Sequence, residues 1–115
     1  MDIRFITDPK GGYKFEEACD KLTEYCRENR IKTNNSNLIV VFSNDWEFIK
    51  EISEKYLKPR IIINVTENLS EHHVCHTLKY VTDICYLKTD VNIIATRIIK
   101  SYNRYYNSRK ERINA

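Results

Sequence analysis

Four short polar segments hold most of the side chains that could bind a ligand or take part in chemistry. The first is Asp8-Pro9-Lys10-Gly11-Gly12, which contains both glycines of this 115-residue chain. Glycines allow a backbone to approach an anion closely, and Lys10 would add positive charge. The glycine spacings of common nucleotide-binding loops, Gly-x-x-x-x-Gly-Lys and Gly-x-Gly-x-x-Gly, are both missing from the sequence. The segment therefore predicts either a weak anion-binding loop or a simple tight turn.

The other three segments are Ser43-Asn44-Asp45, Thr66-Glu67-Asn68 and Lys88-Thr89-Asp90. Like the first, each follows a short apolar run and precedes a pattern that is typical of a helix. If the runs are parallel strands, all four segments lie at one edge of the sheet, where open sheets bind ligands. The candidate ligand-binding residues are Asp8, Lys10, Gly11, Gly12, Asp45, Thr66 and Lys88. Turns and helix caps need the same residue types, so purely structural roles are the alternative.

The apolar patterns around these segments predict the elements that would position them. Apolar runs at 3–7, 38–42, 61–65 and 83–87 alternate with helical spacing at 13–30, 46–57, 69–81 and 91–107. The run at 61–65 lacks regular polar alternation, so helices must cover both faces of its strand. We expect an α/β fold, an open three-layer α/β/α sandwich with a mainly parallel four-stranded sheet, flavodoxin-like, with right-handed crossovers. Residues 1–107 would form this single domain, and residues 108–115 a basic C-terminal tail.

The third predicted helix carries two patterns with different implications. Asn68 is its expected N-cap, and the apolar spacing assigns Val74, Cys75, Leu78 and Val81 to its core face. His72 and His76 fall on the opposite, solvent-facing side. A spacing of four can hold a transition metal, but the glutamate of a His-Glu-x-x-His motif is missing. We therefore expect a solvated histidine pair, with no metal and no cofactor.

The four cysteines, Cys19, Cys26, Cys75 and Cys85, all fall at positions that the spacing assigns to the core. No Cys-x-x-Cys is present in the sequence. Free cysteine in a core behaves as a small hydrophobic residue. The sequence therefore favours buried, reduced thiols over redox or metal chemistry.

The C-terminal part of the chain is strongly basic. Residues 97–112 carry a net charge of +5, whereas the whole chain carries +3. Basic side chains beside tyrosines suit phosphate contacts and base stacking, and they also suit an acidic protein. The candidate nucleic-acid or partner-binding residues are Arg97, Lys100, Arg104, Tyr105 and Arg109. A solvated helix end is the third interpretation.

The composition, 42% hydrophobic and 30% charged, is that of an ordinary soluble domain. No apolar stretch approaches the roughly 20 residues of a membrane helix, and the acidic N-terminus does not resemble a signal peptide. We therefore expect a cytoplasmic protein without membrane contact.

Several of these features together resemble a known family. The segment Pro59-Arg60-Ile61-Ile62-Ile63-Asn64-Val65-Thr66 resembles the fourth strand of a response-regulator receiver domain of the CheY-like family, which ends in Thr or Ser. Asp83-Ile84-Cys85-Tyr86-Leu87-Lys88 resembles that family's fifth strand and its terminal Lys, and Asp90-Val91 opens the last helix in the usual manner. The resemblance covers residues 37–99 and implies a receiver-like fold.

The chain also departs from the family pattern. Phe42 stands where the family has its phosphorylated Asp, and the nearest acid is Asp45. The acidic pair after the first strand is reduced to Asp8, Thr89 replaces the Pro after the Lys, and one βα unit precedes the second strand instead of two. The resemblance therefore implies a shortened receiver-like module that is not phosphorylated and that binds a protein.

The expected function is a non-catalytic regulatory or protein-binding module, and homodimerisation is left open. The first alternative is a small anion- or phosphate-binding protein or enzyme that uses the strand ends. The second is nucleic-acid binding through the basic C-terminal helix. No nucleophile and base can be paired from the sequence, so an enzyme is not favoured.

Overall fold

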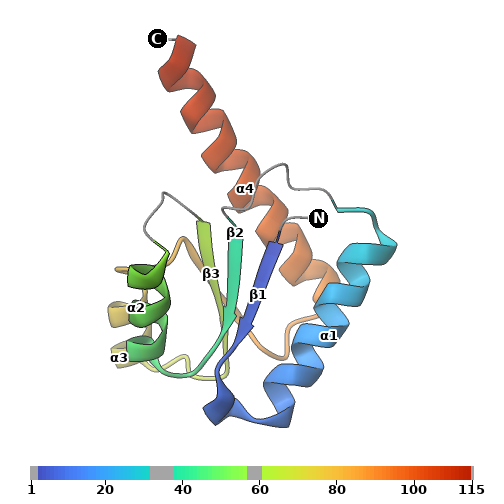
Figure 1. The fold of residues 1–115 in the computed structure, drawn as a ribbon, viewed down its shortest axis with the longest axis vertical. Helices are drawn as coiled ribbons and strands as arrows, with labels where there is room; N and C mark the ends of the chain where they lie inside the picture. The colour runs from blue at the N-terminus through green and yellow to red at the C-terminus, as the bar shows by residue number, and fades with distance from the viewer. Residues whose placement is uncertain (1–2, 32–37, 57–60, 115) are drawn as a thin grey trace.

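The computed structural model describes residues 3–31, 38–56 and 61–114, and in these ranges strands and helices alternate (Figure 1). The strands are β1 (Ile3–Thr7), β2 (Leu38–Phe42), β3 (Ile61–Thr66) and β4 (Asp83–Tyr86). The helices are α1 (Tyr13–Glu28), α2 (Trp46–Lys55), α3 (Glu71–Thr77) and α4 (Val91–Asn114), with a short 3-10 helix, η1 (Pro9–Gly11), before α1.

The four strands form one sheet in the order β1-β2-β3-β4, and every neighbouring pair is parallel. All residues of β2 and β3 are buried, as expected for apolar strands that are covered on both faces. The predicted α/β fold with a four-stranded parallel sheet is therefore confirmed.

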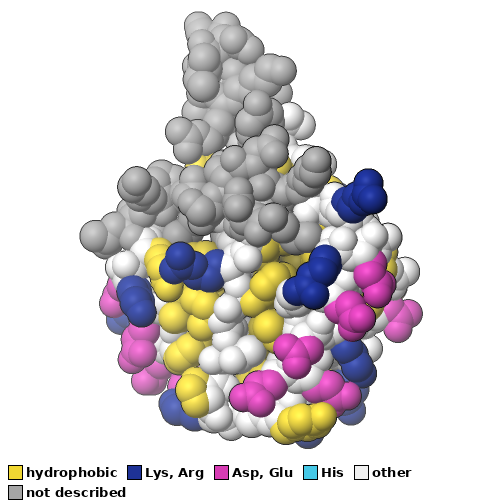
Figure 2. Space-filling model, turned by 45° about the vertical axis from the view of Figure 1, so that its right-hand side comes forward, with side chains coloured by type: hydrophobic (Ala, Val, Ile, Leu, Met, Phe, Trp, Pro, Cys, Tyr) yellow, Lys and Arg dark blue, Asp and Glu magenta, His cyan; other side chains and the backbone are white. Residues whose placement is uncertain are grey.

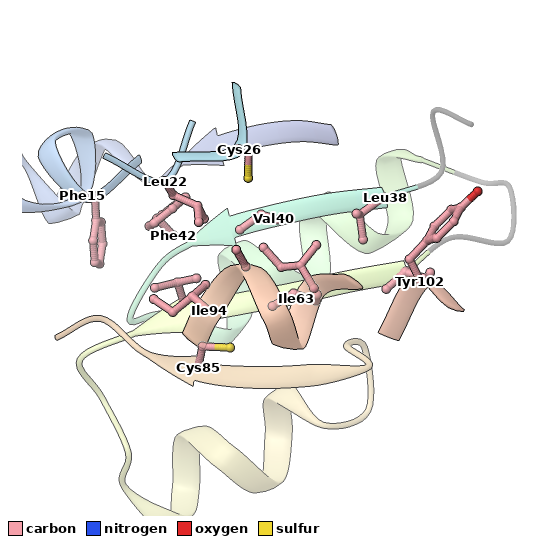
Figure 3. Close-up of a cluster of buried hydrophobic side chains, with 14 residues drawn as sticks. Phe15, Leu22, Cys26, Leu38, Val40, Phe42, Ile63, Cys85, Ile94 and Tyr102 are labelled. Carbon is pink, nitrogen blue, oxygen red and sulfur yellow. The ribbon is translucent and has the colours of Figure 1, made fainter. Parts of the chain in front are cut away.

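Two hydrophobic clusters lie on opposite faces of this sheet because successive side chains of a strand point to opposite sides. On one face, Leu38, Val40 and Phe42 of β2 pack with α1 and α4 (Figure 3). On the other face, Ile39 and Val41 pack with α2, and α3 packs against α2. Figure 1 shows the resulting three layers, with α2 and α3 on one side of the sheet and α1 and α4 on the other.

This arrangement corrects one expectation about the crossovers. Each strand lies on the same side of the strand that precedes it in the chain. Crossovers of one hand would therefore place α1, α2 and α3 on the same face of the sheet. Instead, α1 lies on the face opposite to α2 and α3. The crossover through α1 therefore has the opposite hand to the other two, and the expectation of right-handed crossovers throughout is wrong.

The predicted core face of α3 is wrong at Cys75 and Leu78, whereas Val81 does pack against the core. His73 and Thr77 are the buried residues of α3, whereas Cys75 is exposed and Leu78 is 54% exposed. The N-cap is Ser70, whose hydroxyl accepts a hydrogen bond from the backbone N–H of His73, and not Asn68. The side chain of His73 faces the core because it contacts Asn64, a buried asparagine of β3.

The last helix, α4, reaches far beyond the sheet. Its first half packs on the sheet through Ile94, Ala95, Ile98 and Tyr102. It runs antiparallel to the strands and extends past their amino ends (Figure 1), and it continues to Asn114 through most of the predicted tail. No helix in the described ranges is long and apolar enough to span a membrane.

Candidate functional site

The candidate residues lie at the carboxyl ends of the strands, and Asp8 is the buried carboxylate among them. Its side chain follows β1 and is 3% exposed. The hydroxyl of Ser43 donates to Asp8 Oδ2 at 2.7 Å, and the backbone N–H of Lys10 donates to Asp8 Oδ1 at 3.0 Å. Both carboxylate oxygens are thus hydrogen-bonded within the protein, and Asp8 joins the ends of β1 and β2 while capping η1.

A surface ion pair lies beside Asp8. Lys10 Nζ is 3.0 Å from Asp45 Oδ2, and Asp45 Oδ1 accepts the backbone N–H of Glu47 as the N-cap of α2. Burial raises the pKa of Asp45, but the hydrogen bond from Lys10 and the bond from Glu47 outweigh it and leave that pKa below its usual value. The Asp45 hydrogen bond and charge raise the pKa of Lys10. Each charged group therefore holds the other in its ionised form.

The two glycines serve the local chain geometry. A Cβ on Gly11 would overlap the ring of Phe15, which packs beneath the loop. Gly12 has a φ of +64°, a conformation that other residues rarely adopt. These requirements explain the glycines without an anion. The hollow beside Lys10 has a volume of about 290 Å³ and is lined by one lysine and four acids, Asp8, Asp45, Glu47 and Glu51.

Thr66 also has an internal role. Its hydroxyl donates to Asn44 Oδ1 at 2.8 Å, and the same oxygen accepts the backbone N–H of Glu67 at 2.7 Å. The backbone N–H of Asn68 donates to Thr66 Oγ1 at 2.9 Å. Asn44 and Thr66 thus connect the loops after β2 and β3, and Thr66 is fully buried.

Lys88 lies in a different place from Asp8 and Asp45. It lines a groove of about 580 Å³ between the start of α1 and the start of α4. The floor is apolar and contains Leu22, Phe42, Val65, Leu87 and Ile94. Three lysines and three acids, Lys14, Lys21, Lys88, Glu17, Glu67 and Asp90, also line the groove. The structure therefore divides the predicted site into two parts. Around Asp8 the polar groups are hydrogen-bonded to one another, and around Lys88 there is an amphipathic groove.

Sequence reasoning missed a buried polar cluster below the strand ends. Asn64, in the middle of β3, donates through Nδ2 to the carbonyls of Val41 and Ser43, each at 3.1 Å. Its Oδ1 lies 3.0 Å from His73 Nε2, and Thr77 Oγ1 lies 3.2 Å from the same nitrogen. An asparagine inside an otherwise apolar run was the available signal, because a buried amide needs hydrogen-bonding partners.

The histidine pair contacts an aromatic residue. The ring of His76 stacks on Trp46 with a centroid distance of 4.4 Å, and the rings of His72 and His76 meet edge-on at 4.5 Å. Desolvation, followed by the nearby charges of His72 and Lys79, lowers the pKa of His76. No group of three or more His, Cys, Asp or Glu in the described part of the chain could hold a metal ion.

The basic flank of α4, formed by Arg97, Lys100 and Arg104, makes internal contacts that the sequence did not reveal. Arg97 makes two hydrogen bonds to Asp83, at 2.9 and 2.6 Å. Tyr105 is half-buried against the core, whereas Lys100 and Arg104 are exposed. The side chain of Arg109 lies outside the described residues. Because α4 runs antiparallel to the strands, this flank lies toward the amino ends of the strands, away from Asp8 and Lys88 (Figure 1).

The chain matches no protein-family model, and neither the curated proteins nor the solved structures contain a match.

Proposed function

We propose that this chain is a non-catalytic, receiver-like regulatory module that binds a protein through the groove between α1 and α4. The proposal that the module is non-catalytic rests on the internal contacts of the two strand-end carboxylates, Asp8 and Asp45. Phosphoryl transfer to an aspartate needs carboxylates that are open to a cation and a carboxylate nucleophile. Here Asp8 is buried with both oxygens hydrogen-bonded, and Asp45 is paired with Lys10.

Phe42 supports the same proposal. It ends β2, the strand that resembles the one carrying the phosphorylated Asp in receiver domains, and its side chain is 1% exposed. The ring forms part of the apolar floor of the groove. A hydrophobic side chain at this position offers no acceptor for a phosphoryl group.

The groove has the make-up of a protein-binding surface. Its partly exposed apolar side chains, Ala18, Leu87 and Val91, lie between two helices over a buried apolar floor, and the charged residues that line the groove carry both signs in equal number. Protein interfaces combine an apolar centre with a polar rim in this way. Balanced charge favours a partner with both acidic and basic groups over a simple anion, although the three lysines keep a small anionic ligand as the second candidate.

Charge reversal on the groove tests the proposal. The protein is immobilised as wild type, as Lys21→Glu/Lys88→Glu, and as Lys50→Glu, an exposed change on α2 at the opposite face of the sheet. We expect wild type and Lys50→Glu to retain one protein partner in stoichiometric amount and the double variant to lose it.

A separate measurement tests whether the protein can be phosphorylated. We expect acetyl phosphate or beryllofluoride with Mg²⁺ to leave both the intact mass and the NMR spectrum of the protein unchanged. Stoichiometric modification of Asp8 or Asp45 would contradict the proposal. Saturable shifts of groove signals with inorganic phosphate would instead support the small-anion candidate.

A further inference from the structure

The sheet ends at β1 with a row of unpaired backbone groups. The backbone N–H of Asp8 donates to Phe42 O at 2.8 Å, so Asp8 points toward β2. Neighbouring residues of a strand alternate in direction, and Arg4 and Ile6 therefore also bond to β2. The N–H and C=O groups of Ile3, Phe5 and Thr7 point outward, and within the described part of the chain they have no partner.

This edge lacks the devices that usually protect edge strands. Such strands are commonly very short, bulged or marked by Pro and outward charges. β1 pairs with β2 in unbroken register and contains no Pro. Its one charged residue, Arg4, lies over the ring of Tyr56 at 4.9 Å from the ring centroid. The other edge strand, β4, is one residue shorter and carries the Arg97–Asp83 ion pair.

The side chains along β1 add apolar surface to the exposed backbone. Ile3 and Phe5 contact the cluster under α1, and Ile6 contacts the cluster under α2, but all three are only partly buried. In Figure 2, hydrophobic side chains gather in the middle of the visible face and charged side chains surround them. An added strand would cover backbone and apolar side chains together.

We propose that β1 pairs with β1 of a second copy of this chain, antiparallel and around a two-fold axis at Phe5. In this register Phe5 lies opposite the second copy's Phe5, and Ile3 lies opposite the second copy's Thr7. Each of these pairs exchanges two backbone hydrogen bonds, so all the outward groups of Ile3, Phe5 and Thr7 find partners. The two Phe5 rings meet on one face as a cross-strand aromatic pair. Two four-stranded sheets thus become one continuous sheet.

The charges of α1 explain why a second copy fits this edge. Lys14, Glu17 and Lys21 line the groove toward α4, so Glu16, Asp20 and Arg27 lie on the opposite flank of α1, toward the β1 edge. Acidic residues occupy the first half of this flank and Arg27 the second half. A two-fold axis places the two α1 helices antiparallel, so each acidic half faces the other copy's basic half. Self-complementary charge is what an isologous dimer interface requires.

The test is the molar mass of the full chain as a function of concentration, by sedimentation or light scattering. We expect wild type to approach twice 13.8 kDa as concentration rises. Ile3→Pro removes an outward N–H at the first residue of β1, where Pro is tolerated, and should yield a folded monomer. Asp20→Arg and Arg27→Asp should each weaken the dimer, and combining them should restore it, whereas Lys79→Glu on an exposed site beyond α3 should change nothing.

Amide exchange provides the second readout. The Ile6 amide should be protected at every concentration because it bonds within the monomer. The Phe5 amide should gain protection only as the mass doubles. A protein that stays monomeric up to millimolar concentration overturns the proposal. So does a dimer in which the Phe5 amide still exchanges freely, or one in which the charge swap fails to restore association.

Discussion

Asn64 determines how the buried side chain of His73 is hydrogen-bonded. Because Asn64 Nδ2 donates to two carbonyls, Oδ1 is the atom that faces His73, and His73 Nε2 must carry the hydrogen that this oxygen accepts. Nδ1 then bears the lone pair of the neutral ring. Among the described side chains, it is the buried nitrogen or oxygen without a hydrogen-bond partner. A proton at Nδ1 would place a charge in the core without an acceptor.

The first residue-scale prediction is a loss of stability in mild acid. Burial lowers the pKa of His73, with a smaller opposing effect from Asp45 and a further lowering by His72. The unfolded chain takes up this proton near pH 6.5, while the folded protein takes it up only at lower pH. The unfolded state therefore binds more protons in that window, and the free energy of unfolding should fall as the pH drops below about 6.5.

Urea unfolding between about pH 7.5 and 5.5 measures this dependence. His73→Gln keeps a donor for Asn64 but cannot titrate, so its unfolding free energy should depend less on pH. His72→Gln removes only the smallest of the effects on the pKa of His73, so its unfolding free energy should keep most of the wild-type pH dependence. An NMR titration in which His73 is protonated at or above pH 6.5, or an unchanged pH slope in His73→Gln, would contradict the assignment.

A second residue-scale prediction concerns the thiols. Cys75 is exposed and Cys19 is half-buried, which corrects the expectation that all four cysteines are buried, whereas Cys26 and Cys85 are fully buried. Burial raises the pKa of the Cys85 thiol to about 11, the Arg97 charge opposing it in part. Since the thiolate is the reactive form, a native-state thiol reagent should label Cys75 first and leave Cys26 and Cys85 unlabelled.

Unfolding should release the remaining thiols for labelling. Cys75→Ser should remove the fast phase of the native reaction and change stability little, because the side chain is exposed. Rapid native labelling of Cys26 or Cys85, identified by peptide mapping, would show that the core opens much more readily than their burial implies.

At the scale of elements, the strands could be predicted because each is a short run of β-branched or apolar residues. The start of α1 was also predicted, since Phe15, Leu22 and Cys26 recur at helical spacing. The face of α3 could not be predicted in this way. α3 has only seven residues, and it buries His73 and Thr77 beside Asn64, while apolar spacing selected Cys75 and Leu78.

The hand of the first crossover could not be predicted from the sequence either. An amphipathic helix shows which of its own sides is buried, but it does not show which face of the sheet it covers. α1 lies beside α4 on one face, and this separates the loops after β1 and β2 toward opposite faces. Asp8 and Asp45 line one hollow at this division, whereas Lys88 lies in the groove between the helices of one face.

At the scale of the whole molecule, the charged regions are separated along the strand direction. The acidic hollow beside Lys10 lies at the carboxyl ends of the strands. The net charge of +5 in residues 97–112 runs along α4 from the sheet into the part that extends past the amino ends of the strands. A ligand at one end of the sheet therefore does not contact the other. The basic region can be altered without changing the groove or the β1 edge.

The final prediction is that this basic region does not bind nucleic acid at physiological salt. Proteins that bind single strands without sequence preference combine several phosphate contacts with aromatic rings that stack on bases. Arg97 is paired with Asp83, Tyr102 is 8% exposed, and Tyr105 is packed against the core. We therefore expect a fluorescent oligonucleotide to show no change in anisotropy at about 150 mM salt.

The control for that prediction is a variant with three charges removed, Lys100→Gln, Arg104→Gln and Arg109→Gln. Lys100 and Arg104 are exposed, so the thermal midpoint of the variant should change little, as for surface substitutions worth less than about 0.5 kcal/mol. At low salt any residual attraction of wild type should be weak, similar for all sequences and lost in the variant, because it would come from counterion release. Tight binding by wild type at physiological salt that disappears in the variant would make α4 a nucleic-acid interface. It would also show that charge suffices there without base stacking on Tyr102 or Tyr105.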